Sequence, residues 1–133
     1  MTRVLVFGSF DLIHAGHLAF LKEARTHGDE LVVVLGRDST IEHVKQHRPT
    51  FSESERKTQM LATGIADRVV FGHLDDKYAI IEELNPDVIC LGYDQTFFAD
   101  SLDEELVKRN MTVKIIRLKP YQEDVYKSSK LKR

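Results

Sequence analysis

The chain has one cysteine, no apolar run of membrane-spanning length and no excess of positive charge. Its single cysteine, Cys90, excludes an internal disulfide and a cysteine-rich metal site, and its place in an apolar run predicts a buried thiol. No apolar run approaches the roughly 20 residues that a membrane-spanning helix needs. With a formal net charge of −2, the chain has no overall positive field. We therefore expect neither nucleic acid nor a membrane among its partners.

The beginning of the chain also lacks the charged leader and apolar stretch of a secretory signal, so we expect a cytoplasmic protein. Hydrophobic residues make up 42% of the chain and charged residues 30%, which is ordinary for a globular domain. The chain has 133 residues and shows no internal repeat or linker. The sequence therefore predicts a single domain over residues 1–133.

Apolar runs of strand length alternate with segments of helical spacing. Val, Ile and Leu at nearly every strand position imply burial on both faces, which is typical of a parallel sheet covered by helices. Ser52 and Glu55 match a capping box, and Gly64 marks the end of the helix that follows. The sequence predicts an α/β fold, a Rossmann-like doubly wound sheet of about five parallel strands with helices on both faces. The predicted strands are 3–7, 31–35, 68–71, 88–91 and 113–118, and the predicted helices are 18–24, 52–63, 78–84 and 102–109, with a short helix or loop near 39–46.

The junction between the first strand and the first helix carries two histidines, His14 and His17. Open α/β sheets bind ligands where strands end and helices begin. The free N–H groups and the dipole of a helix start favour a phosphate there. Two imidazoles three residues apart can share one phosphate chain and donate hydrogen bonds to it. The alternative is that the histidines only cap the helix or pack in a polar turn. The junction reads Gly8-Ser9-Phe10-Asp11-Leu12-Ile13-His14-Ala15-Gly16-His17.

This junction resembles the GTFDxxHxGH signature of the cytidylyltransferase-like nucleotidyltransferases, with a serine in place of the threonine. Members of that family transfer a nucleoside monophosphate from a nucleoside triphosphate to a phosphorylated acceptor and release pyrophosphate. The resemblance implies that His14 and His17 are catalytic and stabilise transition-state charge without a covalent intermediate. For Asp11, ordering the turn through backbone amides is the alternative to holding a ligand. Nucleotide contacts are implied for the remaining signature residues, Gly8, Ser9, Phe10, Asp11 and Gly16.

Two basic residues further along the chain resemble phosphate-binding positions of the same family. The segment Arg37-Asp38-Ser39-Thr40 and the later Lys45 resemble an RD-x-T segment followed by a lysine. The resemblance implies that Lys45 is a mobile catalytic cation over the phosphates, the alternative being a merely exposed lysine. Arg56 resembles the arginine of an S/P-x-x-x-R segment, which implies contact with the triphosphate, and a guanidinium suits such a contact. A solvated helix face is the alternative for Arg56.

The last two resembling segments lie in the C-terminal third. The loop after the fourth predicted strand, Gly92-Tyr93-Asp94-Gln95, resembles the family's nucleotide-recognition loop, in which Tyr93 would stack on a base or simply pack. The run Ser128-Ser129-Lys130 resembles the family's terminal segment, whose hydroxyls and positive charge bind the β- and γ-phosphates. Taken alone, that run has the composition of a flexible tail. The helix that usually follows it is nearly missing here.

Three segments of the chain indicate which acceptor is the substrate. The run Gln122-Glu123-Asp124-Val125 stands where bacterial glycerol-3-phosphate cytidylyltransferases have R-T-E-G. Together with residues 37–40 and 91–95, this resembles the archaeal-type FAD synthases. We therefore expect ATP or CTP as donor and FMN as acceptor, with glycerol 3-phosphate as the alternative acceptor. A nucleotide-binding module without catalysis is the third hypothesis. Mg²⁺ should accompany the triphosphate, no protein cage for a metal is visible, and the resemblance implies a homodimer.

Overall fold

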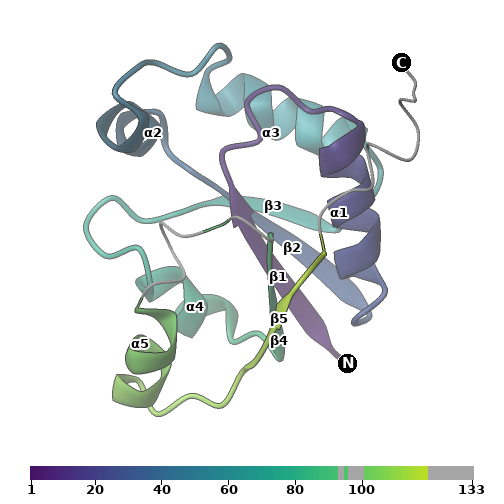
Figure 1. Ribbon diagram of the computed structural model, residues 1–133, viewed down its shortest axis with the longest axis vertical. Helices are drawn as coiled ribbons and strands as arrows, with labels where there is room; N and C mark the ends of the chain where they lie inside the picture. The colour runs from purple at the N-terminus through teal and green to yellow at the C-terminus, as the bar shows by residue number, and fades with distance from the viewer. Residues whose placement is uncertain (93–94, 96–100, 120–133) are drawn as a thin grey trace.

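The computed structural model describes residues 1–92, 95 and 101–119, which surround one five-stranded parallel sheet (Figure 1). Along the sheet the strands follow the order β3-β2-β1-β4-β5. The predicted Rossmann-like α/β fold with five parallel strands is confirmed. The strands are β1 (Arg3–Gly8), β2 (Glu30–Leu35), β3 (Arg68–Phe71), β4 (Val88–Leu91) and β5 (Lys114–Arg117), and the helices are α1 (Ala15–Arg25), α2 (Asp38–Lys45), α3 (Glu53–Ala62), α4 (Ala79–Leu84) and α5 (Leu102–Lys108).

Successive side chains of the central strand, β1, belong alternately to two separate hydrophobic clusters. Val4 and Val6 of β1 belong to a cluster that includes side chains of α1 and α3. Leu5 and Phe7 of the same strand belong to a second cluster, with side chains of α4 and α5. Because side chains alternate between the faces of a strand, each cluster covers one face of the sheet. Figure 1 shows the two helix pairs on opposite sides of the strands, as the doubly wound prediction requires.

Local sequence signals set the ends of the helices. The Ser52 hydroxyl accepts a hydrogen bond from the Glu55 N–H at 3.2 Å, and the Glu55 carboxylate accepts one from the Ser52 N–H at 2.9 Å, which is the predicted capping box. Gly64 follows α3 with a left-handed φ of 72°. The segment left open as a helix or a loop is α2. The first helix begins at Ala15, three residues earlier than the apolar spacing predicts, because a histidine caps it.

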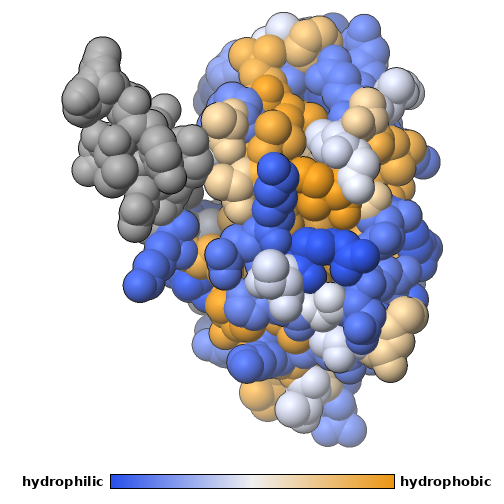
Figure 2. Space-filling view, turned by 90° about the vertical axis from the view of Figure 1, so that its right-hand side faces the viewer, coloured by the Kyte–Doolittle hydropathy of each residue, from blue (hydrophilic) through white to orange (hydrophobic). Residues whose placement is uncertain are grey.

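The side of the molecule that lies to the right in Figure 1 carries hydrophobic and hydrophilic patches next to one another (Figure 2). Among the exposed apolar side chains is Leu61 of α3, at 47% exposure. No helix within the described ranges is both long and apolar enough to cross a bilayer. The Cys90 thiol is buried in β4, and this burial raises its pKa to about 11.

Candidate active site

Two histidines lie stacked at the beginning of α1. The ring centroids of His14 and His17 are 3.9 Å apart, and the ring planes differ by 25°. Nδ1 of His14 accepts a hydrogen bond from the Gly16 N–H at 3.1 Å, and Nδ1 of His17 accepts one from the His14 N–H at 3.3 Å. The side chains therefore cap the helix, as the alternative interpretation holds. They also form a single pair directly after β1, as the phosphate interpretation needs.

These caps fix which ring nitrogen carries the proton. A backbone N–H can only donate, so Nδ1 is the acceptor in each ring and the neutral ring carries its proton on Nε2. Burial, and then the positive charge of His14, lower the pKa of His17 below its ordinary value. A hydrogen bond with the Leu12 backbone raises this pKa, and the charge of Lys45 lowers it further. His17 is therefore mainly neutral at pH 7, with Nε2–H as a donor.

The ring of Phe10 supports His17 and explains the glycine at position 8. Phe10 has a left-handed φ of 46° and is 5% exposed. Its ring meets that of His17 edge-on, with centroids 5.2 Å apart. A Cβ atom on Gly8 would lie 2.7 Å from Cε2 of Phe10, which is too close for a side chain. Gly8 and Phe10 thus shape the loop, and a direct contact of either with a nucleotide stays a prediction.

The predicted mobile lysine lies beside the signature hydroxyl. Lys45, the last residue of α2, is exposed, and its ammonium donates a hydrogen bond to Oγ of Ser9 at 3.1 Å. The charge of Lys45 also lowers the pKa of His17, so it acts on the histidine pair. A cation, a hydroxyl and two imidazoles therefore gather at one end of β1, where a chain of phosphates would find several donors.

Asp11 ties the histidine loop to the segment before α3. Its carboxylate accepts hydrogen bonds from the Thr50 N–H at 2.6 Å and from the Phe51 N–H at 2.8 Å. Burial raises the pKa of Asp11, but these two bonds and the charge of Arg56 outweigh that effect and hold the pKa below its ordinary value. Both oxygens of Asp11 are engaged by backbone amides. This geometry supports the ordering role that the sequence left open.

Arg56 of α3 joins three segments from a fully buried position. Its side chain is 0% exposed. Nε donates to the Phe51 carbonyl at 3.1 Å, Nη1 to the Ser9 carbonyl at 2.9 Å and Nη2 to Oδ1 of Asp38 at 2.7 Å. A solvated helix face is therefore wrong for this residue. Contact with a triphosphate stays a prediction, because the guanidinium has no accessible surface in this arrangement and acts here as a tie.

A second tie connects the end of β4 with β1. Oε1 of Gln95 accepts a hydrogen bond from the Gly92 N–H at 3.1 Å, and its Nε2 donates to the Phe7 carbonyl at 2.9 Å. From β5, Nη1 of Arg117 donates to the carbonyls of Gly92 at 2.6 Å and Gln95 at 3.0 Å. The predicted nucleotide loop therefore begins next to the histidine motif. Sequence reasoning missed Arg117, since its acceptors are backbone carbonyls that leave no residue signal.

Tyr93, Asp94, Ser128, Ser129 and Lys130 lie outside the described residues. Their roles in holding the base and the outer phosphates stay predictions.

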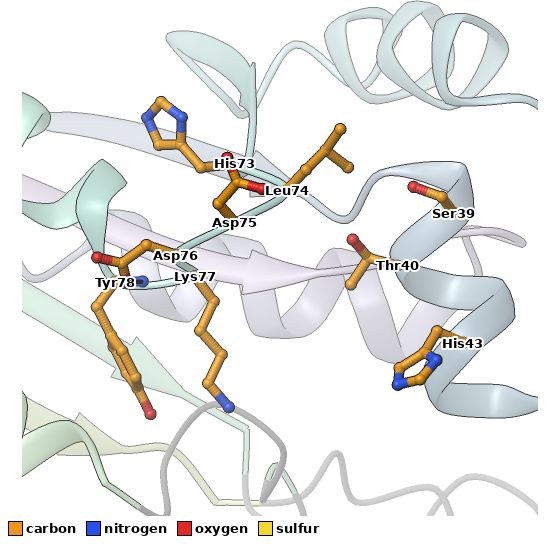
Figure 3. Close-up of a pocket in the computed structure, with 9 residues that line it drawn as sticks. All are labelled: Ser39, Thr40, His43, His73, Leu74, Asp75, Asp76, Lys77 and Tyr78. Carbon is orange, nitrogen blue, oxygen red and sulfur yellow. Dashed lines mark hydrogen bonds between the residues drawn. The ribbon is translucent and has the colours of Figure 1, made fainter.

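A pocket of about 580 Å³ opens between α2 and the segment that joins β3 to α4 (Figure 3). Its two walls follow the carboxyl ends of β2, which pairs with β1, and of β3, which pairs with β2. The pocket therefore lies at the same sheet edge as the histidine pair, because all these strands are parallel. Figure 3 shows Thr40 and His43 projecting from α2 toward the opposite segment. The sequence did not predict this pocket because only Ser39 and Thr40 of its lining belong to a recognised segment, and the other residues form no motif. The lining residues are Ser39, Thr40, His43, His73, Leu74, Asp75, Asp76, Lys77 and Tyr78.

Known proteins similar to this chain identify its family. Residues 5–133 match the cytidylyltransferase-like family. An FAD synthase of Aciduliprofundum boonei is 49% identical over 91% of this chain and 80% of its own length. An FAD synthase of Methanosarcina barkeri is 43% identical over 89% of this chain and 84% of its own.

Solved structures extend the likeness to three dimensions. A lipopolysaccharide core biosynthesis protein of Thermoplasma volcanium superposes with a TM-score of 0.85 at 41% identity, covering 92% of this chain and 99% of the other. A pantoate-β-alanine ligase of Francisella tularensis shares the fold alone, with a TM-score of 0.63 and 16% identity over 91% of this chain and 60% of the other. Since the family match spans nearly the whole sequence and its signature histidines meet where the fold binds ligands, the chain belongs to the cytidylyltransferase-like family and is a nucleotidyltransferase.

Proposed function

We propose that this nucleotidyltransferase is an FAD synthase, which transfers the AMP group of ATP to the phosphate of FMN. The observation that carries the reaction type is the stacked His14–His17 pair, capped so that both rings keep a proton on Nε2. The support for the acceptor comes from the curated relatives, which are named FAD synthases at 39% to 49% identity. CTP in place of ATP is the alternative donor.

The reaction is an in-line displacement at the α-phosphorus. A phosphate oxygen of FMN forms the new P–O bond while the bond between the α-phosphorus and the bridging oxygen breaks, and pyrophosphate leaves with that electron pair. Negative charge grows on the departing oxygen and on the non-bridging oxygens. Nε2–H groups of His14 and His17 donate to this charge, and the ammonium of Lys45 moves from Ser9 to the phosphates. No covalent intermediate on the protein is needed.

The pocket between α2 and the β3–α4 segment is where we place the acceptor. Its volume of about 580 Å³ is that of a small-molecule site, for which roughly 300–1,000 Å³ is usual. Hydroxyls, imidazoles, carboxylates and an ammonium line it, so a polar ring system such as a flavin finds both donors and acceptors. Because Ser39 and Thr40 belong to the helix that ends at Lys45, an acceptor held there lies close to the phosphate site.

Mg²⁺ enters this proposal as a companion of the triphosphate. In the ranges that the structure describes, no group of three or more His, Cys, Asp or Glu side chains is placed to hold a metal ion. Both oxygens of Asp11 are engaged by backbone amides. The residues present therefore do not form a cage, and the phosphate oxygens would carry most of the coordination. A homodimer and a cytoplasmic location stay predictions.

The test is release of pyrophosphate by the purified protein with Mg²⁺, each of four nucleoside triphosphates, and FMN or glycerol 3-phosphate. ATP with FMN should give the highest kcat/KM, and FAD should appear in equal amount to pyrophosphate. His14→Ala and His17→Ala should lower kcat much more than nucleotide affinity, because their donors act on charge that develops in the transition state. Turnover with glycerol 3-phosphate alone would support the cytidylyltransferase alternative. Nucleotide binding without turnover of either acceptor would favour the inactive module.

A further inference from the structure

The wall of the acceptor pocket contains Asp76, whose two carboxylate oxygens bind different partners. Oδ1 of Asp76 accepts a hydrogen bond from the Tyr78 N–H at 3.0 Å, and the Asp76 carbonyl accepts one from the Ala79 N–H at 3.2 Å. These bonds turn the chain into α4. Oδ2 of the same carboxylate accepts a hydrogen bond from Nη2 of Arg109 at 2.7 Å. The shape of the segment that lines the pocket thus depends on a residue from the far end of α5.

Arg109 binds three carboxylates from three parts of the chain. Besides Asp76, its guanidinium contacts Glu82 of α4 and, at 3.3 Å, Glu105 of α5. Its side chain is 16% exposed. The hydrogen bond with Asp76 is the largest influence that raises the pKa of Arg109, and the same bond is the largest influence that lowers the pKa of Asp76. A planar guanidinium can hold several carboxylates at once in fixed directions, which an ammonium cannot.

We propose that Arg109 is a positioning residue for the acceptor: it holds Asp76, and through it the pocket wall, in the shape that binds the flavin. This rests on the proposed function, which places the acceptor in that pocket. Arg109 is not one of the residues that line the pocket, so it acts through Asp76 and does not touch the ligand. Among the residues that the structure describes, the ion-pair partners of Arg109 belong to the β3–α4 segment, α4 and α5, and none belongs to the histidine loop. Replacement of Arg109 should therefore weaken binding of the acceptor and leave binding of the nucleotide unchanged.

A purely structural ion pair makes a different prediction. If Arg109 only stabilised the fold, its replacement would lower the melting temperature and leave both KM values where they are. A positioning role separates the two substrates, because small displacements of a pocket wall change affinity and alignment strongly. The ratio of the KM for FMN to the KM for ATP is the readout that a stability effect does not move.

The experiment compares the wild-type chain with Arg109→Met, Arg109→Lys and Asp76→Asn in steady-state assays of FAD formation, well below each melting temperature. Arg25→Met is the matched control, since Arg25 also pairs with a carboxylate, Asp67 at 3.4 Å, but at the opposite edge of the sheet. The KM for FMN should rise about tenfold in Arg109→Met, on the scale of a misplaced site residue, and by less in Arg109→Lys. The KM for ATP should change by less than about twofold in every variant, because the nucleotide contacts are separate.

The inference is overturned if Arg109→Met keeps the wild-type KM for FMN, or if the KM values for FMN and ATP rise together. Should Arg109→Met not fold, an unchanged KM for FMN in both Arg109→Lys and Asp76→Asn overturns it equally. Wild-type turnover tests the proposed function by itself. If the wild-type chain uses glycerol 3-phosphate and not FMN, the FAD synthase proposal fails, and the same variants test the positioning role with that acceptor.

Discussion

Replacing Arg56 by lysine tests whether Arg56 acts by its three hydrogen bonds between loops or only by its positive charge, because lysine keeps the charge and loses the guanidinium. The guanidinium donates to the carbonyls of Phe51 and Ser9 and to the carboxylate of Asp38. A lysine at the same place can reach one of these three acceptors and leaves the other two without the arginine's hydrogen bonds in a part-buried position. At about 1 kcal/mol for each lost bond, with an added penalty for unpaired acceptors, the free energy of unfolding should fall by about 2–3 kcal/mol. For a domain of this size, about 3 °C per kcal/mol then gives a melting temperature lower by about 8 °C.

The assay is thermal and urea unfolding of the ligand-free protein, followed by KM for ATP at a temperature where both proteins are folded. Arg48→Lys is the control, because the Arg48 side chain is 87% exposed and its Glu42 partner lies at 3.6 Å, so its melting temperature should stay within about 1 °C. We expect Arg56→Lys to lose stability and nucleotide affinity together, since the Ser9 loop would lose its anchor. An unchanged melting temperature with a raised KM for ATP would refute the tie and restore direct phosphate contact as the main role.

Four further outcomes concern His14, His17, Gln95 and Cys90. His14→Ala should raise the pKa of His17, because burial under the neighbouring ring and the charge of that ring both lower it; an unchanged or lower midpoint in an NMR titration would contradict the pairing. The folded state favours neutral His17, because the pKa of His17 is lower in the folded chain than its ordinary value of about 6.5. The stability that His17 contributes is therefore complete above about pH 6.5 and is lost as the pH falls below that value. Urea unfolding at several pH values should show a smaller loss of stability at low pH in His17→Gln than in the wild type. Gln95→Ala should raise the KM for ATP and lower stability, because it removes the bond to Phe7 of β1 and the bond to Gly92 that holds the side chain in place; an unchanged KM would show that the loop does not contribute to nucleotide binding. Cys90 should resist iodoacetamide at pH 8 until the chain unfolds, since its thiol is buried and its pKa is about 11; rapid labelling of the folded protein would show that β4 opens.

Much of the fold could be predicted because its signals are local. A parallel strand buried on both faces needs apolar residues at successive positions, and β2 and β4 consist almost entirely of Val, Ile, Leu and Cys. Ser52 and Gly64 mark the ends of α3 through local backbone geometry that does not depend on tertiary contacts. The beginning of α1 escaped this reasoning, since Ala15 and Gly16 give no apolar period and histidine is an unusual cap.

Only the part of the candidate site that is formed by residues close together in the sequence could be predicted. The histidine pair lies within one turn of helix, so its spacing is enough. Asp11, Arg56 and Gln95 each bond to a backbone group that lies 39 to 88 residues away in the sequence, a separation that no local pattern encodes. A carboxylate, a guanidinium or an amide suits a ligand and a backbone group equally well, and the sequence cannot say which it meets. The acceptor pocket escaped for the same reason, because its two walls come from separate crossovers of the sheet.

The division between ties and exposed donors has a consequence for catalysis. Asp11, Arg56 and Gln95 bind backbone atoms, so each fixes where a loop lies and offers little free polar surface. His14 and Lys45 are exposed, and within the described part of the chain the Lys45 ammonium makes one hydrogen bond, to the Ser9 hydroxyl, which a phosphate can replace at small cost. Variants of the ties should therefore change stability and KM together, whereas a Lys45 variant should change kcat with little effect on stability. A His14 variant should lower kcat and also lower stability, because it removes the cap of α1. A tie variant that lowered kcat alone would mean that the loops keep their places without it, and that its side chain reaches the reacting phosphates.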